Sequence, residues 1–256
     1  MVDLPESAVT LFAILIAPGL GSVARLAADR SRVHEGNLYL LFPPSKCDHC
    51  GKQLEWQCVI PIASWFVLRG QSRCCGLPIS SKHLWVESAC LVLAIWAATE
   101  VTTALLLPTV LLGAVLLGLA MIDLVSFRLP DAGTLGLVAM GLGLSLASVT
   151  GPPAEHALAA VVGFGVFWII GELYYRLRGR EALGLGDAKL LAAAGAWCGL
   201  AALPSVVLIG AIIGLAHAAL LAFRGNAVGA QSALPFGPGL AVGFWLTWLY
   251  GPLVLR

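Results

Sequence analysis

Long apolar stretches dominate the chain, and short polar segments separate them. A helix that crosses a bilayer needs roughly 20 mostly apolar residues. Such stretches recur near residues 8–26, 84–103, 104–123, 132–150, 157–175, 188–202, 204–223 and 235–254. The break between the second and third stretches is weakly marked, and the sixth is short and rich in glycine. The pattern therefore predicts an all-α polytopic membrane protein with about eight transmembrane helices.

The first apolar stretch is typical of a retained helix. Asp3 and Glu6 precede it where a cleaved signal peptide has a basic start, and Pro18-Gly19 interrupts it without a small-residue cleavage pattern. We expect three parts: a first transmembrane helix at 1–26, a cytoplasmic cysteine-rich loop domain at 27–83, and a seven-helix membrane domain at 84–256.

Composition agrees with a membrane protein. Hydrophobic residues make up 59% of the chain and charged residues 11%, whereas soluble domains have about 25% charged residues. A soluble or disordered chain is therefore excluded, and membrane lipid is an expected neighbour. The net charge of +1 gives no indication of nucleic-acid binding.

Positive charges gather on one side if all eight stretches cross the membrane. Every Lys and Arg except the terminal Arg256 lies in or beside the loops that follow the first, third, fifth and seventh stretches. Short cytoplasmic loops carry the Lys and Arg excess of membrane proteins. The sequence therefore predicts that the loop at 27–83 is cytoplasmic and that the N-terminus lies outside.

The cytoplasmic loop carries most of the seven cysteines. Cys47-Asp-His-Cys50, followed by Gly51, has the spacing of a zinc knuckle, whose backbone amides can point at a metal-bound thiolate. The stretch from Ser72 to Cys75 makes an incomplete second half. A loop too small to build its own core is often stabilised by a metal. We expect zinc here, with reduced, metal-free cysteines as the alternative, because a disulfide is disfavoured in the cytoplasm.

Two aspartates fall at the predicted cytoplasmic ends of apolar stretches. Asp123 ends the third, and Asp187 opens the sixth within Gly184-Leu-Gly186-Asp187. At the same depth they can share a proton, so that one activates water while the other donates to a substrate carbonyl, as in aspartic proteases. Glycines before Asp187 let a substrate backbone approach closely. The alternative is that each aspartate is a helix cap or a solvated helix end.

Three further acids lie near helix ends. Asp131 follows Pro130 as an expected N-cap of the fourth stretch, close to the same place as Asp123. Glu87, at the start of the second stretch, and Glu172, near the end of the fifth, are expected to be interfacial anchors or partners of an arginine.

Several motifs occur in the order found in one known family. The matching stretches are Cys47-Asp-His-Cys50-Gly51 to Trp56, Ile60-Pro61 to Arg69-Gly70, Cys75-Gly76 to Ser80, Val86-Glu87, Ile122-Asp123 with Pro130-Asp131, Gly184-Leu-Gly186-Asp187-Ala-Lys189, and Pro235-Phe-Gly237-Pro238. Together they resemble the type IV prepilin peptidases, bacterial leader peptidases of the G-x-G-D aspartic protease group.

Carried over by position, the resemblance implies roles for individual residues. It makes Asp123 and Asp187 the catalytic pair, and it gives a substrate-binding or supporting role to Gly184, Gly186, Lys189, Glu87 and Asp131. It makes Cys47, Cys50 and Cys75 zinc ligands. The family's remaining cysteine aligns with Ser72, which is a poor zinc ligand. Cys74 is the nearest replacement for it, and Cys58 is a more distant one. A site of three cysteines completed by another group is a further option.

The resemblance also implies a substrate and a location. Prepilin and pseudopilin precursors carry a short basic leader on the cytoplasmic side, followed by a hydrophobic helix in the bacterial inner membrane. Cleavage is then expected at the cytoplasmic membrane boundary. Because the predicted cytoplasmic face is itself basic, attraction of the leader would rest on local acids, namely Glu87, Asp131, Glu172 and Glu181.

A second activity is common in the family, whose members often methylate the new N-terminus with S-adenosylmethionine. The first stretch of this chain reads Gly21-Ser22-Val-Ala-Arg25 where the family usually has GSFLNVxxxR. The sequence therefore leaves N-methyltransferase activity open.

Three alternatives fit part of the pattern. A transporter would also place carboxylates and helix breaks in the membrane, but it would normally bind its substrate at the bilayer midplane. A scaffold that binds a partner through its cysteine loop has no need of two aspartates at equal depth. An inactive relative of the family is the third alternative.

Overall fold

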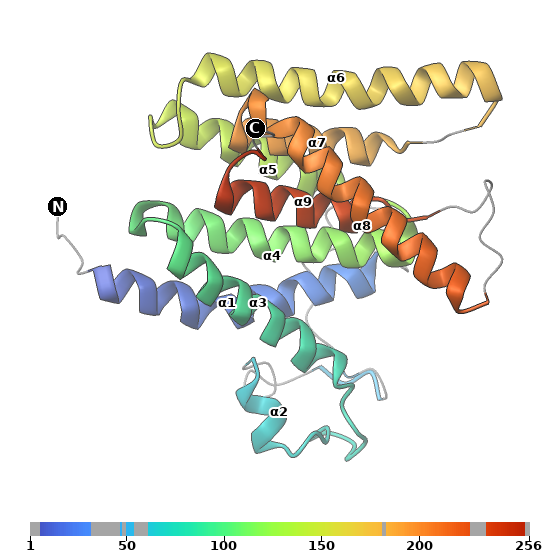
Figure 1. The fold of residues 1–256 in the computed structure, drawn as a ribbon. Coiled ribbons are helices and arrows are strands. Elements are labelled where there is room, and N and C mark those ends of the chain that lie inside the picture. The colour runs from blue at the N-terminus through green and yellow to red at the C-terminus, as the bar shows by residue number, and fades with distance from the viewer. Residues whose placement is uncertain are drawn as a thin grey trace. The chain divides into compact units, whose positions relative to one another are not determined.

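The computed structural model describes residues 6–31, 47, 50–53, 61–180, 183–225 and 234–253. Along this part of the chain the elements are α1 (Glu6–Arg30), α2 (Ala63–Val67), α3 (Lys82–Glu100), α4 (Thr103–Ser126), α5 (Asp131–Leu146), α6 (Pro153–Arg178), α7 (Leu185–Cys198), the 3-10 turn η3 (Leu200–Ala202), α8 (Leu203–Phe223) and α9 (Gly237–Tyr250). Each predicted apolar stretch contains one of these helices (Figure 1). The predicted all-α class is confirmed.

Four of the described helical segments are long and apolar enough to cross a membrane. They are α1, α4, α6 and the segment Leu200–Phe223 that contains α8. Three others, α5, α7 and α9, have 14 to 16 residues. The count of eight spans stays a prediction.

Helix boundaries follow local chemistry. Proline, which lacks an N–H and has a helical φ, opens α6 at Pro153, and Gly179 ends it with a left-handed φ of 66°. The weakly marked break after the second stretch is confirmed, because Val101 is extended between α3 and α4. The N-cap of α5 is Pro130, so Asp131 is the first residue of the helix and not the cap that we expected.

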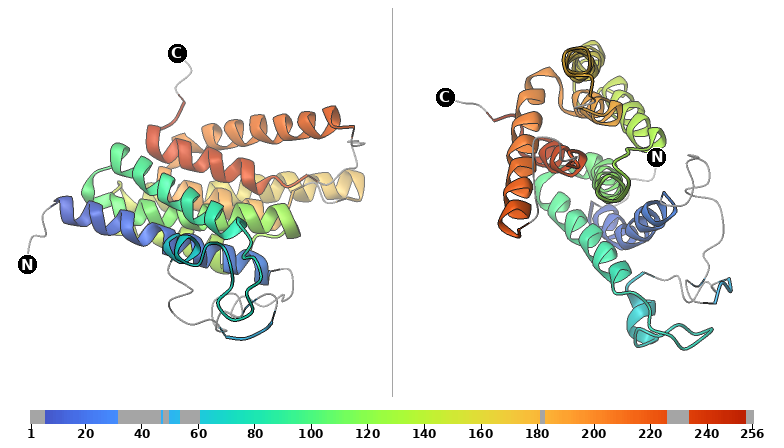
Figure 2. Two further views of the ribbon diagram at one scale, coloured as in Figure 1. Left: turned by 90° about the horizontal axis from the view of Figure 1, so that it is seen from below. Right: turned by 90° about the vertical axis from the view of Figure 1, so that its right-hand side faces the viewer.

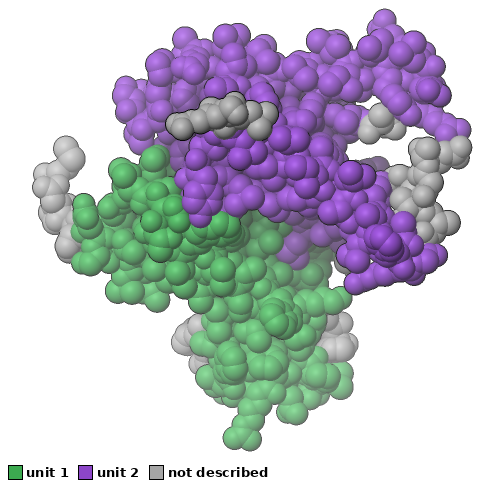
Figure 3. Space-filling model, viewed as in Figure 1, with its two compact units in different colours: residues 1–118 green, residues 119–256 purple. Residues whose placement is uncertain are grey.

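The structure falls into two compact units, residues 1–118 and 119–256, with the boundary inside α4. Figure 3 colours them separately. The division predicted from the membrane boundaries, at residues 26 and 83, stays a prediction.

In the first unit, α1 packs on α3 through small side chains. The buried face of α1 consists of alanines and one glycine, Ala13, Ala17, Gly21, Ala24 and Ala28. A Cβ atom on Gly21 would lie 3.0 Å from the carbonyl oxygen of Val86 in α3. Small residues at such positions let two helix backbones approach closely.

In the second unit, α7 is the central helix and contacts α5, α6, α8 and α9. In the right view of Figure 2, α6 and α7 lie side by side and are seen nearly end-on. The helix is buried from Leu190 to Trp197. The indole N–H of Trp197 donates to the carbonyl oxygen of Leu137 in α5 at 2.8 Å. The short sixth stretch is thus a core helix, and its first turn carries Asp187.

Candidate active site and metal centre

Asp123 lies in the last turn of α4 and points at the start of α9. Its side chain is buried, with 6% of the residue exposed. Oδ2 accepts a hydrogen bond of 2.9 Å from the backbone N–H of Gly237, the first residue of α9. The first N–H groups of a helix have no partner within the helix and favour a negative charge. This helix start therefore orients the Asp123 carboxylate.

Asp187 is the third residue of α7, and Gly184 is the N-cap. The carboxylate of Asp187 accepts a hydrogen bond from the backbone N–H of Gly184. The Asp187 N–H in turn donates to the Gly184 carbonyl oxygen at 3.1 Å. This reciprocal arrangement resembles a capping box, in which the third helical residue reaches back to the cap. Asp187 is thereby held at the start of α7, as the Asp123 carboxylate is held at the start of α9, and it is partly buried.

The second unit brings the two carboxylates near each other, since the charge of Asp123 acts on Asp187. The second glycine of the G-x-G-D motif explains part of this placement. A Cβ atom on Gly186 would lie 2.8 Å from the Cβ of Leu129, in the link between α4 and α5. Glycine at this position therefore lets the start of α7 lie against the segment that follows Asp123.

An ion pair ties the same two segments together. Lys189 Nζ lies 2.5 Å from Asp131 Oδ1, which joins the fifth residue of α7 to the first residue of α5. Both residues were predicted to support the site, but their pairing was not predicted. Their opposite charges partly offset each other.

Glu87 is buried in the first unit and serves local structure. Its carboxylate accepts hydrogen bonds from Ser22 Oγ in α1 at 2.5 Å and from the Ile62 N–H at 2.6 Å. Ile62 has a left-handed φ of 58°, which is unusual for a β-branched residue. Glu87 thus joins α1, α3 and the start of α2.

The cysteine loop contains two knuckles with the same hydrogen bonds. In the first, the N–H of Gly51 donates to the Cys47 carbonyl oxygen at 2.9 Å, and the N–H of Cys47 donates to Lys52 at 2.8 Å. In the second, the N–H of Gly76 donates to Ser72 at 2.7 Å, and the N–H of Ser72 donates to Leu77 at 2.7 Å. Both Gly51 and Gly76 have left-handed φ values of 68° and 70°.

Ser72 therefore occupies the place in the second knuckle that Cys47 occupies in the first. The fourth sulfur comes from Cys74: its Sγ lies 3.3 Å from that of Cys50, while the Cys47 and Cys75 sulfurs are 3.8 Å apart. The buried Ser72 hydroxyl contacts two of the sulfurs, at 3.4 Å from Cys47 Sγ and 3.0 Å from Cys74 Sγ. Cys58, the more distant option for this ligand, lies outside the described residues.

The cluster fits a metal ion. The sulfurs of Cys47, Cys50, Cys74 and Cys75 all lie within 4.8 Å of one another. Four sulfurs around zinc at about 2.3 Å are separated by about 3.8 Å. The backbone N–H of Lys52 lowers the pKa of the Cys50 thiol, but the hydrogen bond with Cys74 and the neighbouring Cys47 raise it, to about 11 overall. A bound cation would stabilise the thiolates that these neighbours disfavour.

Two contributors to these sites were not singled out from the sequence. Gly237, the donor to Asp123, stands in the Pro235-Phe-Gly237-Pro238 motif, whose paired prolines and glycine indicate a helix start but not what it binds. Ser72 was considered only as a poor ligand, although its hydroxyl contacts two of the sulfurs.

Comparison with known proteins identifies related chains. Residues 110–219 match the type IV leader peptidase family, and residues 15–101 match the bacterial peptidase A24 N-terminal domain. A prepilin leader peptidase/N-methyltransferase from Dickeya chrysanthemi is 41% identical over 208 residues, 79% of this chain and 72% of that protein. A protein of the same name from Burkholderia pseudomallei strain K96243 is 38% identical over 83% of this chain and 69% of that protein. Another from Aeromonas hydrophila is 35% identical over 89% of this chain and 79% of that protein. No solved structure matches the chain.

The fold and site define a helical membrane protein with two aspartates at neighbouring helix starts and a cysteine module that can hold a metal. The matches identify it further. The chain belongs to the type IV leader peptidase family. The resemblance inferred from the motifs is confirmed, and so is the predicted class of enzyme, a hydrolase that acts as a leader peptidase.

Proposed function

We propose that the protein is the aspartic endopeptidase that removes the basic leader of type IV prepilin-like or pseudopilin precursors at the cytoplasmic boundary of the inner membrane. Asp123 and Asp187 are the catalytic pair. The observation that carries this proposal is the placement of both carboxylates at helix starts within one unit, each held by a backbone N–H.

The pair has the chemistry that hydrolysis of a peptide bond needs. Two close carboxylates share one proton, because both cannot be ionised comfortably. The ionised member takes a proton from water, whose oxygen attacks the scissile carbonyl carbon, while the protonated member donates its proton to the carbonyl oxygen. Transfer of a proton to the amide nitrogen then lets the C–N bond break, which releases the leader and the new N-terminus.

The position of the acids disfavours the competing classes. Asp123 lies in the last turn of α4 and Asp187 in the first turn of α7. A transporter would normally hold its substrate near the middle of the spans. Two other acids were predicted to lie near the site. Glu87 accepts hydrogen bonds from Ser22 and Ile62, and Asp131 is paired with Lys189, so neither is proposed as a member of the catalytic pair.

Zinc is the metal that we propose for the cysteine cluster, with Cys47, Cys50, Cys74 and Cys75 as ligands. When bound, the ion would supply a structural link between the two knuckles. The residues themselves supply the rest: Gly51 and Gly76 make the tight turns, and Ser72 hydrogen-bonds to the sulfurs from behind.

Co-expression with a prepilin or pseudopilin, followed by mass spectrometry of its N-terminus, tests the proposed function. Wild-type protein should release the leader. Asp123→Asn and Asp187→Asn should each abolish cleavage at unchanged protein level and zinc content, since an amide can neither accept nor donate the shared proton. The double variant should be no worse than either single one, because the pair acts as a unit. A correctly cut leader from Asp187→Asn would refute the aspartic mechanism.

Methylation of the new N-terminus is a second candidate activity, because the names of the related proteins include N-methyltransferase. The methyl donor would be S-adenosylmethionine. The same mass spectra test it, since the mature precursor would gain the mass of one methyl group only when both the protease and the donor are present.

A further inference from the structure

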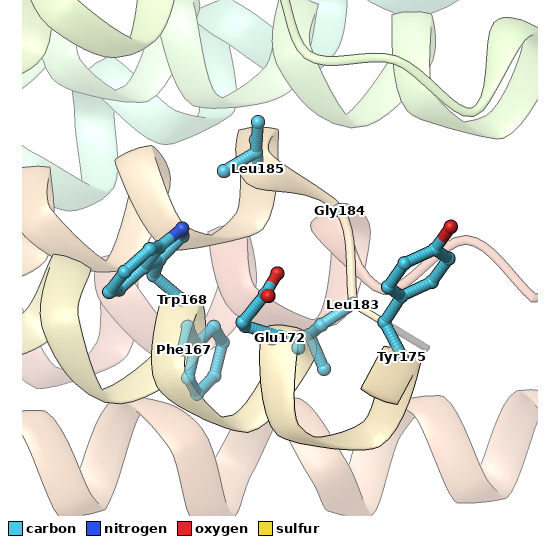
Figure 4. Close-up of a pocket in the computed structure, with 9 residues that line it drawn as sticks. Phe167, Trp168, Glu172, Tyr175, Leu183, Gly184 and Leu185 are labelled. Atoms are coloured by element: carbon cyan, nitrogen blue, oxygen red, sulfur yellow. The ribbon is translucent and has the colours of Figure 1, made fainter. Parts of the chain in front are cut away.

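A groove of about 440 Å³ lies between α6 and the first turn of α7. Figure 4 shows its walls, which are mostly aromatic and aliphatic. Phe167, only 5% exposed, forms the floor, whereas Trp168, Tyr175 and Leu185 are each about half exposed at 49%, 52% and 58%. The groove is therefore lined by apolar surface that a ligand can reach.

Glu172 is the one charged residue among those that line this groove, all of which lie in the described part of the chain. Residues 168, 172 and 175 are spaced four and three positions apart, so they share one face of α6. Figure 4 shows the Glu172 carboxylate between the Trp168 and Tyr175 side chains. A carboxylate is thus placed within an otherwise aromatic wall.

The groove adjoins the N-cap of α7, which contacts one aspartate of the proposed pair. Gly184 lines it, and the backbone N–H of this glycine donates to the Asp187 carboxylate. Whatever occupies the groove therefore lies next to the residue that caps α7 and holds Asp187.

The chemistry of the lining selects its occupant. A carboxylate between aromatic rings suits a lysine or arginine side chain, whose aliphatic stem packs on the rings while its charge meets the acid. Arg176 already forms an ion pair with this carboxylate, since its Nε lies 2.7 Å from Glu172 Oε1. The Arg176 side chain is 74% exposed, and an exposed pair of this kind contributes little stability. An incoming cation can replace it.

We propose that this groove is a substrate subsite that binds a lysine or arginine side chain of the precursor near the scissile bond, with Glu172 as its counter-charge. The inference rests on the proposed function, in which the substrate has a basic leader. Of the described acids that could attract such a leader, Glu172 lines the groove, whereas Asp131 and Glu87 do not. Glu181 lies outside the described residues.

Steady-state cleavage of a purified precursor by the full-length protein tests the subsite. Glu172→Gln should raise KM about five- to tenfold with kcat nearly unchanged, the size expected for one cation–π contact together with one ion pair. Arg176→Gln should instead lower KM, because it removes the competing cation. Glu155→Gln, at the opposite end of α6, is the matched control and should leave both constants unchanged.

Opposite signs for the two variants separate a binding role from a structural one. If the pair only stabilises α6, Glu172→Gln and Arg176→Gln lose the same contact and should behave alike, which would overturn the proposal. Replacing the leader's basic residues by glutamine one at a time gives a second readout. Replacement of the leader residue that binds in the groove should raise KM for wild-type protein but leave KM for the Glu172→Gln protein unchanged. An equal rise in KM for both proteins, at every leader position, would overturn the proposal.

A binding measurement distinguishes failure of the subsite from failure of the proposed function. A fluorescent precursor peptide can be bound to Asp187→Asn protein, with and without Glu172→Gln. If wild-type protein fails to cut the precursor but binding still depends on Glu172, the proposed function fails and the subsite stands. If wild-type protein cuts the precursor and neither KM nor binding responds to Glu172→Gln, the function stands and the groove holds only lipid or solvent.

Discussion

Gly237 controls how closely the start of α9 approaches Asp123. A Cβ atom at this position would lie 2.8 Å from Oδ2 and 3.0 Å from Cγ of the buried carboxylate. Gly237→Ala should therefore push the carboxylate off its N–H donor and reduce kcat/KM for precursor cleavage by about tenfold or more, as misplacement of a catalytic group by a fraction of an ångström does.

Gly136→Ala is the matched control for this substitution. It also adds one methyl group to a helix of the second unit, but nothing lies within 4 Å of the new atom. Its activity should equal that of wild-type protein. Full activity of Gly237→Ala, at normal expression, would contradict the proposed role of Asp123.

Ser72 and Cys74 provide a second test at the scale of single residues. Because Ser72 occupies the position equivalent to Cys47, Ser72→Cys should supply a sulfur from the regular knuckle position and tighten zinc binding. Cys74→Ser in wild-type protein should weaken it by more than the roughly 10- to 100-fold that loss of an outer-shell partner costs. In the Ser72→Cys background, Cys74→Ser should have little effect. Competition with a chelator measures both affinities.

The reverse result would show that the fourth ligand was misassigned. If Cys74→Ser leaves zinc affinity unchanged in wild-type protein, then three cysteines and another group hold the metal. The sequence left this choice open for a physical reason. The spacing places Cys50 and Cys75 at equivalent turns of the two knuckles. The identity of the fourth ligand, however, depends on the direction in which the backbone points the Cys74 side chain, and the sequence pattern does not reveal this direction.

At the scale of elements, the Asp131–Lys189 ion pair links α5 to α7 beside the aspartates. Both side chains are partly exposed, at 47% and 24%, so the pair should contribute at most about 1 kcal/mol to stability. Its larger effect is on position. Asp131→Asn and Lys189→Gln should each lower kcat/KM about three- to tenfold, and the double variant should be no worse than either single one.

Charge exchange is the control for this prediction. Asp131→Lys combined with Lys189→Asp restores the pair in reverse and should recover part of the activity that either substitution alone removes. If Asp131→Asn is inactive while Asp123→Asn still cuts the precursor, then Asp131 and Asp187 are the catalytic pair.

The long apolar stretches were sufficient to predict the helices but not which helices pack against one another. All eight apolar stretches contain helices because each is long, apolar and bounded by proline, glycine or charge. The central place of α7 was not predicted, since Gly163 and Gly195 make close contacts with backbone atoms that lie far away in sequence. The pairing of Lys189 with Asp131 was missed for the same reason: it joins residues 58 positions apart.

At the scale of the whole molecule, the basic residues favour eight membrane crossings. Each of the four long apolar helices has a basic residue at or just after its C-terminal end: Arg30 for α1, Arg128 for α4, Arg178 for α6 and Arg224 for α8. Consecutive spans run in opposite directions. If only these four crossed, their basic ends would alternate between the two sides, against the preference of short cytoplasmic loops for Lys and Arg.

All four basic ends face the cytoplasm only if one further helix crosses between each pair of long ones. The shorter helices α3, α5 and α7 stand at those places, and α9 follows as the eighth span. Reporter fusions after residues 60, 180 and 226 should therefore report the cytoplasm, and fusions near 152 should report the outside. Gly151 and Pro152 join α5 to α6, so an outside signal there requires both helices to cross. A cytoplasmic signal at 152 would mean that α5 does not cross, which would overturn the eight-span prediction. If α6 still crossed, Asp187 would begin α7 on the side opposite Asp123, which the proposed mechanism does not permit.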